Sequence, residues 1–372
     1  MPSAAVELAR DLVRLPSMNP PGDETGPIGL LARLLETAGL ACEVHAFAPN
    51  RPSLVARLPG SGDGAPLAFT GHVDVVPLGA APWSRDPFAG EISDGKLHGR
   101  GSADMKAGIA AFVDAVLEIA DRELSRGITL VITAGEETGC EGAFHLARVG
   151  ALGRASLLVV AEPSSNEMIL AHKGSLRLGV TARGRTAHSS MPELGDNAIY
   201  KAVDWIGRLR TFSFAAPDHP LLGGSTLAVT TIQAGLNINS IPDKARFTVD
   251  FRTVPAEDHA ALLAAVCTAT GPDAEIVTVV DVPGFSTAPG DLAITPVIAA
   301  YERAFGRPPV PLGAPYFTDA SALTPAFGNV ATVVIGPGDM GQAHQTDEFC
   351  RVDRIDEARA IYADIIRTTC LT

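Results

Sequence analysis

The chain has 372 residues, enough for about two domains of average size and for a large buried core. Hydrophobic residues make up 46% of the sequence and charged residues 19%, which excludes a chain that is disordered throughout. Acidic side chains outnumber basic ones by 42 to 29, and the formal charge of −13 argues against a nucleic-acid partner because phosphates would be repelled.

Neither a membrane span nor a secretory signal is expected. The sequence holds no run of about 18 uncharged apolar residues. The N-terminal stretch carries charges where a signal peptide needs an apolar centre, at Glu7, Arg10, Asp11 and Arg14. The five cysteines are widely spaced without a CxxC pair, so reduced thiols are expected. These features predict a cytoplasmic protein without a membrane partner.

The first part of the chain alternates helix-like and strand-like patterns. Amphipathic helices are expected at 4–15 and 29–40, and strands at 41–47 and 53–59. Almost continuously apolar runs follow, typical of strands covered on both faces, at 67–77, 128–137, 156–163 and 331–338. Further helices are expected at 105–124 and 294–306. The pattern predicts an α/β fold with a mostly parallel sheet and helices on both faces.

From about residue 174 the strands change character, because apolar and polar residues alternate as in strands with one wet face. Such strands are expected at 175–184, 226–235, 245–253 and 274–282, with helices at 197–210 and 258–269. The order β-α-β-β-α-β is a compact unit able to fold alone. We therefore predict an inserted α+β domain at 174–285, with residues 1–173 and 286–372 forming a catalytic, metal-binding domain.

Carboxylates and histidines follow the buried runs. They are His72 and Asp74, Glu136 and Glu137, Glu162, and His344. In open α/β sheets the carboxyl ends of the strands form the ligand crevice, so these side chains are expected to converge. Crowded carboxylates repel one another unless a cation lies between them. Mixed imidazole and carboxylate ligands favour zinc, with manganese or cobalt as alternatives, and the sequence predicts one or two divalent ions.

Spacing within the motifs indicates separate roles. His72 and Asp74 are two residues apart and lie on one side of an extended strand, where one can ligate a metal while the other orients it. If Glu137 binds metal, its neighbour Glu136 is left beside the site as a general base. Asp104 lies in the glycine-rich segment 99–108, from which its carboxylate can reach the crevice.

Each of these residues also has an ordinary structural explanation. A lone histidine is more often a core or surface group, adjacent glutamates often lie in a solvated turn, and Asp104 near a helix start would favour the helix dipole. Their joint occurrence after strand-like segments is what favours a metal site.

Six motifs, in this order, resemble the M20 metallopeptidase family: GHVDVVP, GRGSADMKAG, AGEETG, AEPS, GRTAHSSMPELGDNAI and AHQTDEF. The resemblance spans most of the chain. The family includes acetylornithine deacetylases, succinyl-diaminopimelate desuccinylases, aminoacylases and glutamate carboxypeptidases. The resemblance implies a zinc-exopeptidase-like catalytic domain and an inserted lid and dimerisation domain.

The resemblance further implies two zinc ions. His72, Asp104 and Glu162 would bind one ion, and Asp104, Glu137 and His344 the other, with Asp104 bridging. Glu136 would be the base that activates water, and Asp74 would steady His72.

The resemblance also implies a homodimer formed through the inserted domain, with His188 donating to the developing oxyanion in the partner's site. The sequence leaves open whether His188 acts within or across subunits. Asn239 and Arg252 match positions around the substrate carbonyl and carboxylate, and arginine offers carboxylates two parallel hydrogen bonds. Residues 315–323, PYFTDASAL, depart from the Gly-Thr pattern of desuccinylases and many deacetylases, which leaves the acyl group open.

These implications favour an amide hydrolase that removes an acyl group from an N-acyl amino acid, of the acetylornithine deacetylase or desuccinylase type. One alternative is an exopeptidase of the same family that releases a C-terminal amino acid from a short peptide. Another is a binding protein that retains the fold without catalysis. A dinucleotide-binding enzyme and a serine hydrolase fit less well, because the glycine-rich segment follows a turn and no GxSxG motif occurs.

Overall fold

The computed structural model describes residues 2–371, which form two compact units. The first unit contains the described residues up to Ala171, Ser286–Gly313, and the residues from Thr318 onward. The second contains His172–Phe285 and Ala314–Phe317. The segment 174–285, predicted as an inserted domain, lies within the second unit. No helix within 2–371 has both the length and the apolar character that crossing a bilayer requires.

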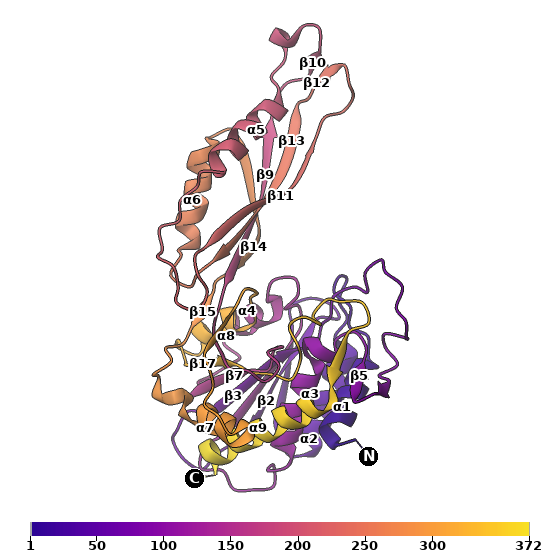
Figure 1. Cartoon of the computed structure of the whole chain (residues 1–372), viewed down its shortest axis with the longest axis vertical. Helices are drawn as coiled ribbons and strands as arrows, with labels where there is room; N and C mark the ends of the chain where they lie inside the picture. Colours follow the sequence, from indigo (N-terminus) through magenta and orange to yellow (C-terminus); the bar gives the residue numbers. More distant parts are fainter. Residues whose placement is uncertain (1, 372) are drawn as a thin grey trace. The chain divides into compact units, whose positions relative to one another are not determined.

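A mixed sheet lies at the centre of the first unit (Figure 1). Of the nine strands that the structure describes in this sheet, seven are, in spatial order, β1 (Ala41–Ala46), β2 (Pro52–Leu58), β6 (Ile128–Thr133), β3 (Leu67–His72), β7 (Leu157–Val160), β17 (Thr332–Val334) and β8 (Ile169–His172). The inner strands β6, β3, β7 and β17 are parallel and buried, and the pairings toward β1 and β8 are antiparallel. The prediction of a mostly parallel sheet is confirmed.

Helices cover both faces of this sheet. They are α1 (Ala4–Val13), α2 (Thr25–Thr37), α3 (Ala107–Leu117), α4 (Glu141–Arg148), α7 (Thr295–Phe305), α8 (Ala320–Ala326) and α9 (Val352–Cys370). Helices α1, α3, α7 and α9 pack against one another, and α3 and α9 contact β3. Helix α4 contacts α8 and β2, and Figure 1 shows α4 and α8 across the sheet from α3 and α9. This confirms the predicted layers.

The helix expected at 105–124 begins later and ends earlier than the pattern indicated. Residues Ser102–Lys106 form an irregular turn in which Asp104 and Met105 have non-helical backbone angles. Beside this turn, β4 (Ile92–Ser93), β5 (Lys96–His98) and β18 (Phe349–Arg351) form a small separate sheet. The two remaining strands of the central sheet, β15 (Phe285–Ser286) and β16 (Leu312–Ala314), lie where the chain passes between units.

The second unit is an antiparallel sheet with helices on one face (Figure 1). Its strands, in spatial order, are β11 (Thr226–Ala234), β13 (Lys244–Thr253), β9 (Gly174–Arg183) and β14 (Ala274–Val282). Helices α5 (Ala198–Leu209) and α6 (His259–Thr270) bury Trp205, Leu262 and Val266 against Phe247 and Val249 of β13. The chain order confirms the predicted β-α-β-β-α-β arrangement. A short ribbon, β10 (Ala187–His188) with β12 (Ser240–Ile241), completes this unit.

Candidate metal centre

The parallel core of the sheet explains why the candidate ligands meet. Strand β3 ends at His72, which pairs with Thr133 at the end of β6, and β7 and β17 end together at Val160 and Val334. Glu136 and Glu137 follow β6 and Glu162 follows β7 after short connections, and His344 follows β17 after a longer loop. The carboxyl edge of a parallel sheet therefore collects side chains from segments far apart in the sequence.

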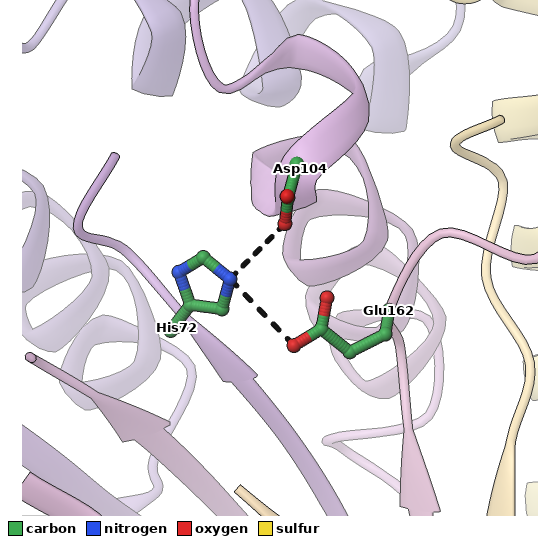
Figure 2. Close-up of side chains that lie close together, drawn as sticks. All are labelled: His72, Asp104 and Glu162. Atoms are coloured by element: carbon green, nitrogen blue, oxygen red, sulfur yellow. Dashed lines mark hydrogen bonds and ion pairs between the residues drawn. The ribbon is translucent and has the colours of Figure 1, made fainter. Parts of the chain in front are cut away.

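The first ligand group consists of His72, Asp104 and Glu162, whose ligand atoms all lie within 4.8 Å of one another. Nε2 of His72 lies 3.2 Å from Asp104 Oδ1 and 3.6 Å from Glu162 Oε1, as Figure 2 shows. Nδ1 of the same ring lies 2.9 Å from the main-chain oxygen of Asp74. If Nδ1 carries the proton and donates it there, Nε2 is left as the ligand atom.

The second ligand group consists of Asp104, Glu137 and His344, again within 4.8 Å of one another. Nε2 of His344 lies 3.0 Å from Glu137 Oε2 and 3.5 Å from Asp104 Oδ2. Asp104 thus turns Oδ1 toward His72 and Oδ2 toward His344, and its carboxylate belongs to both groups. His72 is buried, whereas His344 is exposed.

The electrostatics of these donors fit bound cations. Burial raises the pKa of Glu162 well above its usual range and also raises that of Glu137, and the neighbouring Asp104 adds to both shifts. Burial would lower the pKa of His72, but Glu162, Asp104 and Asp74 outweigh it and raise that pKa well above the usual value. These buried side chains therefore favour their protonated forms, as crowded carboxylates do when no cation separates them. Two nitrogen and several oxygen donors in two groups fit two divalent metal ions.

Asp74 organises the turn that carries both glutamates. Its buried carboxylate accepts hydrogen bonds from the main-chain N–H groups of Glu136 and Glu137, each at 3.2 Å, and from Asn19 Nδ2 at 2.9 Å. The carboxylate lies 3.5 Å from His72 Nδ1, farther than its own main-chain oxygen. Sequence reasoning missed Asn19, which lies in a loop before two prolines and has no periodic signal.

Glu136 lies beside the ligands but belongs to neither group. Burial raises its pKa well above the usual value, and Glu162 and Glu137 add to the shift. Within residues 2–371, its carboxylate accepts one hydrogen bond, from the Cys140 thiol with Sγ 3.9 Å from Oε1. Another buried acid, Asp319, was missed by sequence reasoning. Burial raises its pKa to about 6. Asp319 lies within the segment 315–323, which was noted in the sequence only for its departure from the Gly-Thr pattern.

The second unit separates its predicted site residues. His188 is exposed, with Nδ1 2.7 Å from Ser190 Oγ, and it lies in the β10–β12 ribbon next to Asn239, whose main-chain oxygen accepts from Ser189 N at 2.9 Å. Arg252 lies near the far end of β13, where its Nε is 3.1 Å from Asp250 Oδ1.

The length of β13 measures this separation. Lys244, at the ribbon end, pairs with Arg183, and Arg252 pairs with Ser175 at the other end of β9. At about 3.3 Å per residue, the strand rises roughly 26 Å between Lys244 and Arg252. One copy of the second unit therefore brings His188 and Asn239 together but holds Arg252 apart from them.

Comparison with known proteins decides the family. The family model described as peptidase family M20/M25/M40 matches residues 68–368. This chain belongs to the M20 peptidase family. A succinyl-diaminopimelate desuccinylase from Cereibacter sphaeroides strain KD131 is 35% identical, with 99% of each chain covered. An acetylornithine deacetylase from Proteus mirabilis strain HI4320 is 32% identical, covering 98% of this chain and 97% of the relative.

A solved M20 structure has the same fold. The M20 family metallo-carboxypeptidase Sso-CP2 from Sulfolobus solfataricus matches with a TM-score of 0.83 and 17% identity, covering 98% of this M20 chain and 99% of the other. The family resemblance inferred from the six motifs is thereby confirmed. The M20 protein described here is a metal-dependent hydrolase that acts on amide or peptide bonds.

Proposed function

We propose that this enzyme is a deacylase that removes the acyl group from an N-acyl amino acid, of the desuccinylase or acetylornithine deacetylase type. One observation carries the proposal: two ligand groups share Asp104, and the buried carboxylate of Glu136 lies outside both groups. The choice of a deacylase is supported by the two relatives with these names, which match along almost the whole chain.

The proposed cofactor is a pair of zinc ions, with cobalt or manganese as alternatives. His72, Asp104 and Glu162 would hold one ion, and Asp104, Glu137 and His344 the other. Mixed imidazole and carboxylate donors without sulfur support this choice. When bound, such ions lower the pKa of water and polarise the scissile carbonyl.

The protein's own groups then handle the proton. Glu136 takes a proton from the attacking water and passes it to the leaving amine. Burial raises the pKa of Glu136, which favours uptake of the proton from water before its transfer to the amine nitrogen. Asp74 fixes the turn that carries Glu136 and Glu137 by accepting hydrogen bonds from their main-chain N–H groups, and the main-chain oxygen of Asp74 orients the His72 ring.

Arg252 is the proposed partner of the substrate carboxylate. Arg252 and Arg177 both contact the carboxylate of Asp250, so two guanidinium groups share one negative charge. One positive charge remains for a substrate carboxylate, which arginine can bind with two parallel hydrogen bonds.

We also propose a homodimer in which His188 and Asn239 serve the partner's active site. A substrate as long as three or four extended residues spans about 12 Å, which is less than the roughly 26 Å rise of β13. If Arg252 and His188 contact one substrate, two copies must supply them. The exposed edge strand β11 and the exposed Tyr200, Leu236 and Ile238 support an interface on the second unit. There His188 would donate to the developing oxyanion.

A substrate panel tests the proposed activity. Metal-free protein is reconstituted with zinc, cobalt or manganese and assayed on N-succinyl, N-acetyl and N-formyl amino acids beside dipeptides. We expect kcat/KM for the preferred acyl amino acid to exceed that of every dipeptide by about tenfold or more. A preference for dipeptides would instead identify an exopeptidase. Two bound metals and measurable ligand binding without turnover would identify a binding protein. The cytoplasmic location stays a prediction.

A further inference from the structure

Glu348 lies four residues after His344 and is completely buried. Its carboxylate is surrounded by donors from the loop that carries Asp104. Oε2 accepts from Gly101 N at 2.9 Å and from Arg100 Nη1 at 2.7 Å. Oε1 accepts from Ala103 N at 2.8 Å and from Asp104 N at 3.0 Å. Three main-chain N–H groups of one short loop thus converge on a single carboxylate.

The small sheet beside the metal centre explains how Glu348 reaches this loop. Strand β18 pairs with β5 so that Phe349 lies opposite His98. Glu348 directly precedes β18, and Gly99 directly follows β5 and donates its N–H to the main-chain oxygen of Glu348 at 2.9 Å. The pairing therefore holds the segment after His344 against the segment that leads to Asp104.

The loop has little freedom to satisfy its N–H groups in another way. Gly101 has φ +84, and a Cβ there would lie 2.5 Å from Val75 Cγ1. On the other side, the backbone of Gly338 lies so close that a Cβ there would meet the Ala103 oxygen at 2.1 Å. Because buried N–H groups need acceptors, the Glu348 carboxylate shapes the loop as well as filling the space.

We propose that Glu348 is a positioning residue that shapes the Gly101–Asp104 loop so that the Asp104 carboxylate faces His72 with one oxygen and His344 with the other. The inference rests on the metal-binding roles in the proposed function but not on the substrate. The ordinary alternative is an ion pair between Glu348 and Arg100 that only stabilises the fold. The three main-chain N–H groups favour the positioning role, because they belong to the segment that ends at the shared ligand.

Metal affinity of Glu348→Gln tests the inference. Glutamine has one oxygen and one NH2 group, so one pair of loop donors would face another donor. Zinc affinity is measured by chelator competition on metal-free protein. We expect binding at both sites to weaken by about 10–100-fold, because Asp104 is shared and partners that orient ligands commonly have effects of this size.

Glu24→Gln is the matched control. Glu24 is also completely buried and pairs with an arginine, Arg51, at 2.9 Å, but within residues 2–371 its carboxylate makes no hydrogen bond to the loop that carries Asp104. We expect Glu24→Gln to lower thermal stability while zinc affinity stays within about twofold of wild type. Equal affinities of wild type and Glu348→Gln would overturn the inference, and so would equal losses in both variants.

If Glu348→Gln folds poorly, amide hydrogen exchange of the metal-free wild type and Glu348→Asp provides a second test. Glu348→Asp retains the charge but shortens the side chain, and we expect faster exchange in peptides covering 99–106 with unchanged exchange in the inner strands. Uniform exchange changes would overturn the inference in favour of a purely structural role.

A wild-type protein that binds no divalent metal would overturn this inference together with the proposed metal roles. One that binds two ions but hydrolyses no substrate overturns the proposed function alone, and the weaker binding of Glu348→Gln would still support this inference.

Discussion

In the first unit, five candidate ligands from separate segments fall into two groups whose ligand atoms lie within 4.8 Å of one another, whereas the second unit holds His188 and Asn239 at one end and Arg252 at the other. The difference follows from the two sheets. Parallel strands all end at the same edge, so the residues after them collect there. Antiparallel strands end alternately at opposite edges, so their polar residues are dispersed. The first unit gathers both ligand groups by itself, whereas one copy of the second unit keeps Arg252 apart from His188 and Asn239.

Among the variants that test this comparison, Asp104→Asn is expected to have the largest effect on metal binding and activity. The shared carboxylate serves both ligand groups, so both ions should bind weakly. Loss of Lewis-acid stabilisation worth several kcal/mol would lower activity by about 10⁴-fold or more. Metal content and kcat of the purified variant check this. The exposed Asp63→Asn is the control and should retain both, and retention of two tightly bound ions by Asp104→Asn would contradict the shared role.

Glu136→Gln should lose kcat while keeping the metal. Removing a general base typically costs about 10²–10⁴-fold, and Glu136 lies outside both ligand groups. Steady-state kinetics and metal analysis separate the two effects. Glu141→Gln, an exposed glutamate of the same segment, should match wild type within about twofold. Full turnover by Glu136→Gln with metal bound would rule out the assignment.

His188→Ala tests the second unit, whose candidate site residues lie far apart. Loss of one oxyanion donor should lower kcat by about 10²–10³-fold with KM nearly unchanged. Mixing this variant with Glu136→Gln then asks which subunit His188 serves. If His188 acts across a symmetric dimer, random exchange of subunits should restore on the order of a quarter of wild-type activity, because half of the dimers are mixed and each mixed dimer has one intact site. No recovery after proven subunit exchange would place His188 in its own subunit's site.

Arg252→Lys should weaken substrate binding more than catalysis. The variant keeps the charge but loses the planar fork, and a charge-assisted hydrogen bond is worth about 1.5–3 kcal/mol, so KM should rise about 10–100-fold. Arg246→Lys, at an exposed position of the same strand, is the control. A substrate analogue without the carboxylate should bind wild type and Arg252→Lys equally. A KM unchanged in Arg252→Lys would remove Arg252 from the substrate site.

The smallest expected effect concerns the stability of the second unit. Burial lowers the pKa of His172 to about 4, so the folded chain favours the neutral ring while the unfolded chain is protonated near its usual pKa of 6.5. This group's contribution is therefore complete above about pH 6.5 and lost as the pH falls toward 4, by about 3 kcal/mol. Urea unfolding at pH 7 and pH 4 should show a smaller loss for His172→Gln than for wild type. The exposed His188→Gln should keep the wild-type pH dependence, and an identical loss in His172→Gln would contradict the prediction.

Much of the fold could be predicted because its signals are local. Continuous apolar runs marked β3, β6 and β7, and alternation marked β9 and β13. The irregular turn Ser102–Lys106 was not predictable, because its apolar pattern continues into α3 and only tertiary contacts hold Asp104 in a non-helical conformation. Helices α8 and α9 were likewise absent from the predicted elements.

Within the site, sequence reasoning singled out the residues that follow strands and missed those that support them. Asn19, Asp319 and Glu348 act through contacts with segments 55, 186 and 245 residues away, respectively, to Asp74, Thr133 and Ala103. No local pattern reports such contacts. The geometry also shows that the His72 ring lies nearer the main-chain oxygen of Asp74 than its carboxylate.

By itself, the sequence determined the types of chemistry available, since imidazole and carboxylate groups after buried apolar runs predict a metal site on a parallel sheet. Only the tertiary structure decided which oxygen of Asp104 faces which histidine, that the Glu348 carboxylate accepts hydrogen bonds from the loop that carries Asp104, and that Arg252 lies a strand's length from His188. The physical reason is that residue types and periodicity are encoded locally. Distances between segments arise from strand pairing and packing across the whole unit.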